Sequence, residues 1–260
     1  MTRPRAGLSL PGRLRPEVYE SEGKWLESGV AKVDWLGRAN LPNVNLLDVG
    51  SDPAFVKALL DESLPIDRYA GVSFFRETVD WLRANVPDPR FEFHHLDAGN
   101  AWLNPGGKPL DGIDGLPVGS GRFGLISVTS VFDHLPPDDY ATMLRLLRRH
   151  IEPSGKLAFS IVIIDAEHPA PLEEELRSKL RSDSADVRAR AEDSIAAAIE
   201  RTMSTDHDPR FVDWDPDEPL ARAQYTEDYA VELVDRNGWQ VEAIDPPQHH
   251  GSHSIRCRPA

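Results

Sequence analysis

The chain has 260 residues and a formal net charge of −14, since 43 Asp and Glu face 29 Lys and Arg. Hydrophobic residues make up 40% of it, which is typical of a globular protein and excludes a disordered or fibrous one. The acidic balance argues against a partner that is a nucleic acid or an anionic membrane, because both surfaces are negative.

The cysteine content and the lengths of the hydrophobic runs indicate in which cellular compartment the protein is expected. Cys257 is the single cysteine, which excludes an intrachain disulfide and a thiolate zinc cluster. No apolar run approaches the roughly 20 residues that span a bilayer. The basic N-terminal stretch lacks the apolar core of a secretory signal, so we expect a cytoplasmic protein, with an amphipathic transit peptide as the alternative.

The apolar spacing predicts helices that alternate with strands. The first sixteen residues are rich in Pro, Arg and Gly and are predicted to form a flexible arm before a single domain over 17–260. Helices are predicted over residues 18–36, from Pro53, and over 76–86, 137–151 and 226–237. Strands are predicted over 44–49, 69–73, 91–96, 123–129, 156–164, 239–244 and 253–257. This alternation predicts a mostly parallel sheet that is covered by helices on both faces.

Residues 165–223 interrupt the alternation and are predicted to form an insertion. An apolar seam with mostly four-residue spacing from Leu172 to Met203 predicts long helices, and residues 206–219 are predicted to form a loop. We interpret the seam as a lid over a substrate pocket or as a homodimer surface. The insertion holds 16 acidic and 8 basic residues, so more than half of the net charge belongs to it. This charge is interpreted as a solvated cover that disfavours a polyanionic substrate.

In an open parallel sheet, ligands bind outside the carboxyl ends of the strands. The residues that follow the first four strands are therefore candidates for a site: Gly50, Ser51, Asp52, Ser73, Phe74, Asp97, Ala98 and Ser130 to His134. Asp52 and Pro53 also have a purely structural interpretation, as the N-cap and the first residue of a helix. His134 likewise has one, as a structural histidine before the helix at Pro137.

Two motifs at these strand ends point to a known family. The first comprises Asp97, Asn100, Asn104, Pro105 and Gly106, and the second is the run Thr129 to Leu135, which reads TSVFDHL. Together with Ile151 to Gly155, they make the chain resemble the class I S-adenosylmethionine (SAM)-dependent methyltransferases, in a bacterial branch with a TSVFxHL motif. The resemblance covers residues 44–164 and, more weakly, 225–260. It implies a Rossmann-like fold with a mostly parallel seven-stranded sheet, whose last strand is antiparallel. In this chain, the predicted helical insertion 165–223 follows the fifth strand.

The resemblance also implies roles for individual residues, with SAM as the cofactor. The implied cofactor-binding residues are Asp48, Gly50, Ser51, Asp52, Ser73, Phe74, Asp97, Ala98, Thr129 and Ser130. The turn at Gly50 would approach the methionine end of SAM, and Asp97 would contact the adenine. His134 is the candidate general base, which Asp133 would orient.

The chain departs from the family pattern at two places. Its first turn keeps only Gly50 of the three usual glycines, and Ser73 stands where an acid usually binds the ribose hydroxyls. We expect methylation of a small molecule or glycan, at a hydroxyl. A catalytically inactive binding or assembly protein with the same fold is the alternative that these departures motivate. A nicotinamide-dependent oxidoreductase ranks last because a G-x-G-x-x-G turn is missing.

Two histidine groups raise the question of a metal site. They are His94 with His95, and the run from His249 to His253. Neighbouring residues on a strand point to opposite faces, so His94 and His95 are unsuited to hold one ion together. We therefore predict no metal ligands.

Overall fold

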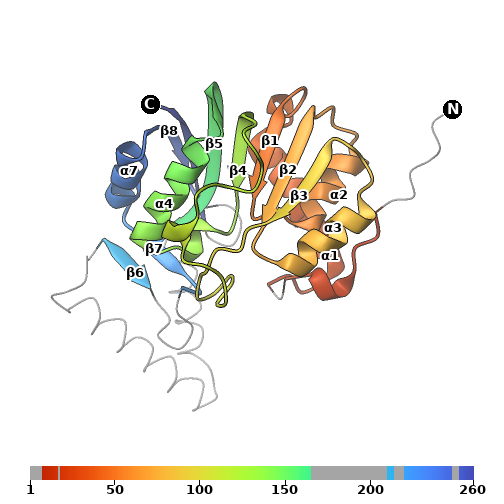
Figure 1. Ribbon diagram of the computed structural model, residues 1–260, viewed down its shortest axis with the longest axis horizontal. Helices are drawn as coiled ribbons and strands as arrows, with labels where there is room; N and C mark the ends of the chain where they lie inside the picture. Colours follow the sequence, from red (N-terminus) through yellow and green to blue (C-terminus); the bar gives the residue numbers. More distant parts are fainter. Residues whose placement is uncertain (1–7, 17, 165–209, 214–219, 248–251) are drawn as a thin grey trace, which may run out of the picture.

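The computed structural model describes residues 8–16, 18–164, 210–213, 220–247 and 252–260, which form a mixed sheet with helices on both faces (Figure 1). The helices are α1 (Glu22–Leu36), α2 (Pro53–Asp61), α3 (Arg76–Asn85), α4 (Pro137–Arg148) and α7 (Glu227–Arg236). The strands are β1 (Asn45–Val49), β2 (Arg68–Ser73), β3 (Phe91–His95), β4 (Phe123–Val128), β5 (Ile151–Ile163), β6 (Phe211–Asp213), β7 (Ala223–Tyr225), β8 (Trp239–Asp245) and β9 (His253–Pro259).

The centre of the sheet is parallel, as predicted. Strands β3, β2, β1, β4 and β5 lie side by side and run parallel, and β9 then pairs antiparallel with both β5 and β8. All seven predicted strands are present in the described residues, and the last one is antiparallel, as expected. The reversal at β9 makes the sheet mixed rather than wholly parallel.

Two additional strands extend the sheet beyond the seven that the sequence predicts. β7 pairs in parallel with the end of β5 at Val162 and Ile163, and β6 pairs antiparallel with β7. β6 lies within residues 206–219, which the sequence analysis assigned to a loop. That assignment is wrong for Phe211–Asp213, because a strand of three residues is too short to show a periodic pattern and forms here through its pairing with β7.

β5 begins earlier than predicted. Ile151 already pairs with Phe123 of β4, and the register then shifts so that Lys156 pairs with Leu125. The bulge accommodates Pro153, which the sequence analysis placed before the strand. Proline is tolerated at such irregularities because the missing N–H costs no ladder hydrogen bond there.

Alternate residues of β1 pack into two cores on opposite faces of the sheet. Leu47 and Val49 belong to the core beneath α4 and α7, whereas Leu46 belongs to the core beneath α1, α2 and α3. Figure 1 shows these two helical layers on either side of the sheet. Because side chains alternate along a strand, Asp48 shares the face of Leu46 and points toward α1.

The segment before α1 is more ordered than predicted over residues 8–16. Leu10 is buried and packs in one cluster with Trp25 of α1 and Ala54 of α2. α1 begins at Glu22 rather than at residue 18, because the Ser21 side chain accepts a hydrogen bond from Lys24 N at 3.2 Å and caps the helix.

The seam from Leu172 to Met203, from which helices are predicted, lies outside the described residues, so its role as a lid or dimer surface stays a prediction. Among the helices that are described, we find none with the length and apolar character needed to cross a membrane.

Candidate functional site

A cavity of about 1140 Å³ lies at the carboxyl ends of the parallel strands. Its volume exceeds the roughly 300–1,000 Å³ typical of a pocket for one drug-sized ligand, so it has room for two molecules. Ten of the twelve predicted site residues line it: Gly50, Ser51, Asp52, Ser73, Phe74, Asp97, Thr129, Ser130, Asp133 and His134. The other two, Asp48 and Ala98, are buried and lie behind the wall.

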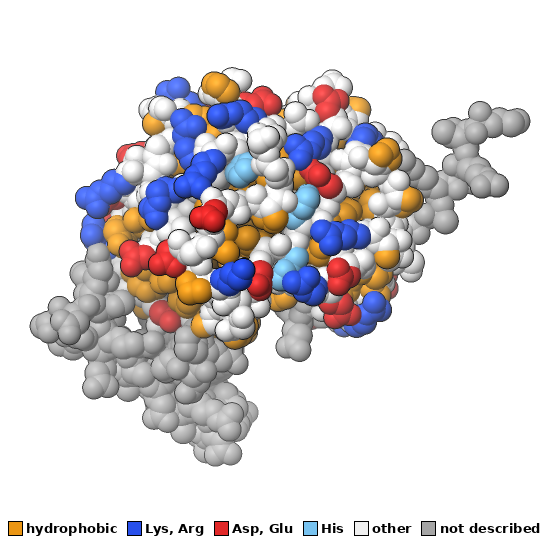
Figure 2. Space-filling view, viewed as in Figure 1, with side chains coloured by type: hydrophobic (Ala, Val, Ile, Leu, Met, Phe, Trp, Pro, Cys, Tyr) orange, Lys and Arg blue, Asp and Glu red, His pale blue; other side chains and the backbone are white. Residues whose placement is uncertain are grey.

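Surface charge alone does not mark a site on the face shown in Figure 2. Basic and acidic side chains are interspersed there, with apolar groups between them. The site is therefore defined by the cavity and by the side chains that line it.

The turn after β1 depends on the glycine at its centre. Gly50 has a φ of +83°, and a Cβ there would lie 2.3 Å from the carbonyl oxygen of Thr129. The amides of Gly50 and Ser51 both donate to Val72 O, at 2.9 and 3.0 Å. The backbone of the turn is thus fixed against β2 and β4 before any ligand is considered.

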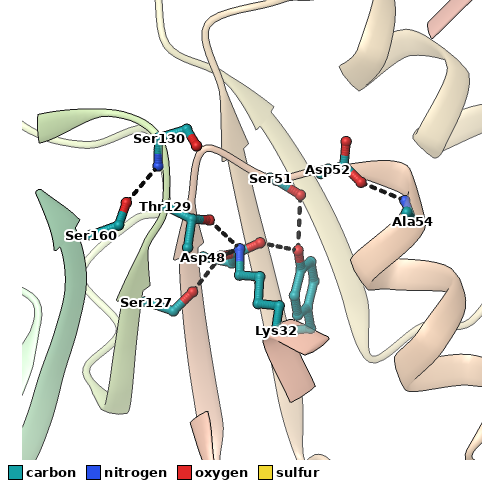
Figure 3. Close-up of polar contacts among 10 residues, drawn as sticks. Lys32, Asp48, Ser51, Asp52, Ala54, Ser127, Thr129, Ser130 and Ser160 are labelled. Atoms are coloured by element: carbon teal, nitrogen blue, oxygen red, sulfur yellow. Dashed lines mark hydrogen bonds and ion pairs between the residues drawn. The ribbon is translucent and has the colours of Figure 1, made fainter. Parts of the chain in front are cut away.

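Asp52 holds the start of α2 in place. Its carboxylate accepts hydrogen bonds from Ala54 N at 2.7 Å (Figure 3) and from Trp25 Nε1 at 2.9 Å. Burial raises the pKa of Asp52, and the donors and the nearby ammonium of Lys32 partly oppose that rise. The structural interpretation as an N-cap is therefore correct, and the same carboxylate also lines the cavity.

Asp48 lies beneath the turn at the centre of a buried polar network (Figure 3). Lys32 Nζ lies 2.6 Å from Asp48 Oδ1 and donates to Thr129 Oγ1, also at 2.6 Å. Ser127 Oγ donates to Asp48 Oδ1 at 2.5 Å, and Tyr69 OH donates to Oδ2 at 2.7 Å. Since Asp48 is fully buried and Lys32 lines the cavity, Asp48 acts on the site by holding Lys32.

Close packing of α1 against α2 brings Lys32 to this position. A Cβ at Gly29 would lie 2.3 Å from the carbonyl oxygen of Ala54, so only glycine permits the approach. The Lys32 ammonium also lies 4.4 Å from the centre of the Phe55 ring. Sequence reasoning missed Lys32, although a carboxylate in the middle of a buried strand signals that a cation must reach it.

The ends of β2 and β3 form a second part of the wall. Ser73 is almost fully buried, and its hydroxyl accepts a hydrogen bond from Phe75 N at 3.2 Å. The exposed ring of Phe75 lines the cavity beside Phe74. Asp97 Oδ1 lies 3.4 Å from Asn104 Nδ2, which joins two residues of the first motif.

His95 also faces this part of the cavity. Its Nδ1 lies 3.1 Å from Arg76 Nη2, and its Nε2 lies 3.1 Å from the carbonyl oxygen of Phe74. A guanidinium only donates and a carbonyl only accepts, so Nε2 carries the proton of a neutral ring.

The end of β4 brings the predicted catalytic pair together in a 3₁₀ turn, Phe132–His134. His134 Nδ1 lies 2.9 Å from the carbonyl oxygen of Leu220, which can only accept, so Nδ1 is the donor of this hydrogen bond. His134 Nε2, the other ring nitrogen, lies 4.0 Å from Asp133 Oδ1. The His134 ring is nearly parallel to that of Trp102, with 6.0 Å between centroids.

No group of three or more His, Cys, Asp or Glu side chains is arranged to hold a metal within the part of the chain that the structure describes. His94 lies 3.5 Å from Glu92 and does not line the cavity, whereas His95 does. His249 and His250 lie outside the described residues.

No family model matches the chain. Solved methyltransferases nevertheless share its architecture. The magnesium protoporphyrin IX methyltransferase of Synechocystis PCC 6803, solved with S-adenosylhomocysteine (SAH), superposes with a TM-score of 0.54 at 11% identity, over 95% of this chain and 92% of that one. A Burkholderia thailandensis 1,6-didemethyltoxoflavin-N1-methyltransferase, solved with 1,6-didemethyltoxoflavin and SAH, gives a TM-score of 0.53 at 14% identity, over 94% of this chain and 81% of that one.

The pyocyanin biosynthetic protein PhzM gives a TM-score of 0.55 at 15% identity, over 91% of this chain. The match covers only 56% of the length of PhzM, so the similarity extends over about half of that longer protein. These similarities show that the chain has the class I methyltransferase fold.

Proposed function

We propose that the protein is a SAM-dependent methyltransferase that methylates a hydroxyl group of a small molecule. The observation that carries the proposal is His134, which lines the same cavity as the turn at Gly50 and whose Nδ1 donates to Leu220 O, so that Nε2 is the nitrogen left to act as a base. The fold and the volume of the cavity support it, because a methyltransferase must hold two molecules side by side.

The side chains at the β1 turn suit the amino-acid end of SAM. That end carries one ammonium and one carboxylate, and the cavity wall offers the Asp52 carboxylate and the Lys32 ammonium in the same region. Asp97 would accept a hydrogen bond from the adenine amino group, beside the rings of Phe74 and Phe75. The residues therefore fit the cofactor at both of its ends.

The middle of the cofactor would be held less firmly. A carboxylate at position 73 would accept hydrogen bonds from both ribose hydroxyls, whereas Ser73 has one hydroxyl that already accepts from Phe75 N. A hydrogen bond to a charged group contributes roughly 1.5–3 kcal/mol, so we expect the affinity to be lower than with an acid at this position. This feature favours a binding protein without catalysis as the second candidate function.

His134 would act as the general base. Bound SAM would supply a methyl group on a positively charged sulfur, and the acceptor oxygen would take that methyl group as the carbon–sulfur bond breaks, with SAH as the leaving group. His134 Nε2 takes the hydroxyl proton, because Leu220 O already holds the proton of Nδ1. The carboxylate of Asp133, 4.0 Å away, then stabilises the imidazolium.

Calorimetric titration with SAH tests the cofactor assignment. We expect saturable binding, and the absence of heat at millimolar SAH would refute the enzyme in favour of the second candidate. Transfer of a labelled methyl group from SAM to a panel of hydroxy compounds tests the base. His134→Ala should lower turnover by roughly 10²–10⁴-fold with little change in SAH affinity. His94→Ala is the matched control, since His94 lies outside the cavity wall.

A further inference from the structure

Arg222 lines the cavity just before β7, and its guanidinium has an unused donor. The Nη1 atom is buried and has no hydrogen-bond partner among the residues that the structure describes. A guanidinium keeps its charge at ordinary pH and presents several N–H groups in a fixed plane. Because a buried donor without an acceptor is unfavourable, a molecule bound in the cavity is the natural source of that acceptor.

The charges that line the cavity nearly balance, although the protein as a whole is strongly acidic. Five Lys and Arg and four Asp and Glu line it, in a chain with a net charge of −14. Two of the basic residues have carboxylate partners, Lys32 with Asp48 and Arg13 with Glu77, and the proposed function already assigns Lys32 to the carboxylate of SAM. Arg76 contacts His95, and Arg222 forms no ion pair with a carboxylate of the described residues, so its charge is available to an anionic group of a ligand.

Arg222 belongs to the same part of the cavity as His134 and Trp102. The carbonyl oxygen of Leu220 contacts His134 Nδ1. Arg222 follows Leu220 by two residues, so the Cα atoms of Leu220 and Arg222 are at most about 7 Å apart. The Trp102 ring is 46% exposed and nearly parallel to the His134 ring. A flat apolar surface, a basic nitrogen and a guanidinium therefore gather in one region.

We propose that Arg222 binds a carboxylate of the acceptor, and that the acceptor is an aromatic hydroxy acid whose ring lies against Trp102. The inference rests on the proposed function, in which the acceptor hydroxyl reaches His134 Nε2. Guanidinium and carboxylate form paired, charge-assisted hydrogen bonds, which give orientation as well as affinity. Such pairing would turn the hydroxyl of a flat molecule toward the base.

The test compares two probes of nearly the same shape, the anionic 3-hydroxy-2-naphthoate and the neutral 3-hydroxy-2-naphthamide. Each is titrated calorimetrically into the full chain at pH 7.5. The carboxylate should bind at least about tenfold more tightly than the amide. Arg222→Gln should abolish this preference, and Arg222→Lys should reduce it, because an ammonium lacks the paired geometry. Arg236→Gln, on the exposed surface of α7, is the matched control that keeps the preference.

Equal affinity for the two probes in the unmodified protein would overturn the inference, as would a preference that survives in Arg222→Gln. If Arg222→Gln does not fold, an undiminished preference in Arg222→Lys overturns it instead. SAH binding without a carboxylate preference refutes the inference and leaves the proposed function standing. A preference that depends on Arg222 in a protein that binds no SAH supports the anion site and refutes the proposed function.

Discussion

Replacing Lys32 with methionine removes the cation from the network beneath the β1 turn while keeping an apolar chain of similar length. The Lys32 side chain is 9% exposed and that of Asp48 is fully buried, so the pair is an internal one. The substitution leaves a carboxylate in the core without a countercharge. The two hydroxyl donors, Ser127 and Tyr69, still contact it.

The expected loss of stability follows from these contacts. Breaking a buried ion pair by removing one partner typically costs roughly 3–5 kcal/mol, because an uncompensated charge remains. Since two hydrogen bonds to Asp48 survive, we expect the lower end, about 3 kcal/mol. For a chain of this size, that loss lowers the melting temperature by roughly 6–12 °C.

Urea unfolding followed by circular dichroism measures the effect, as a lower midpoint with an unchanged slope. Lys57→Met is the matched control: Lys57 forms a surface pair with Asp61 at 2.7 Å, and its loss should cost less than about 1 kcal/mol. The double variant Lys32→Met with Asp48→Asn should cost clearly less than the sum of the two single changes, because it removes both charges.

Additive costs in the double variant would refute this reasoning, as would a loss for Lys32→Met no larger than that for Lys57→Met. Either result would mean that the network contributes contacts but little charge stabilisation. SAH affinity provides an independent measurement on the same variants. If Lys32 holds the carboxylate of the cofactor, Lys32→Met should weaken SAH binding by about tenfold or more, whereas Lys57→Met should leave it unchanged.

Three further predictions concern the turn, the ribose position and pH. Gly50→Ala should destabilise the fold by more than about 2 kcal/mol in urea unfolding, since its φ is +83° and its Cβ would press on Thr129 O; a smaller loss would show that the turn can relax. Ser73→Asp should strengthen SAH binding about tenfold in calorimetry, and weaker binding would mean that the ribose lies elsewhere. Burial lowers the pKa of His150 in the folded protein below its ordinary value of about 6.5. As the pH falls toward and below that value, the unfolded chain therefore binds more protons than the folded one, and the free energy of unfolding should decrease. Urea midpoints between pH 7.5 and 5.5 should therefore depend less on pH in His150→Asn, and an unchanged dependence would contradict this assignment.

The elements that carry strong local signals were predictable from the sequence. The short apolar run of β1, followed by Asp52 and Pro53, predicted both a buried strand and the start of α2, and the structure places them there. The position of these residues at a strand end also predicted the cavity wall. The helix cap at Asp52 and the turn at Gly50 are local features, and they determine how β1 leads into α2.

The residues that the sequence did not reveal act over long distances in the chain. Lys32 lies on a helix whose charged residues look solvent-exposed, and only Gly29 and the packing of α1 on α2 bring it to Asp48. Trp102 and Arg222 come from a loop and from the edge of the insertion, where no periodic pattern locates a side chain. Their meeting near His134 depends on the pairing of β7 with β5.

The place of β9 between β5 and β8 has a consequence for biosynthesis. β8 precedes β9 in the chain, yet β9 is the strand that joins it to β5. Until β9 emerges from the ribosome, β5 has a largely apolar edge that lacks its pairing with β9, and β8 lacks the same partner. Unpaired edges of this kind invite association between nascent chains. The yield of folded protein should therefore depend on how well chaperones shield the growing chain, as well as on the stability of the finished fold.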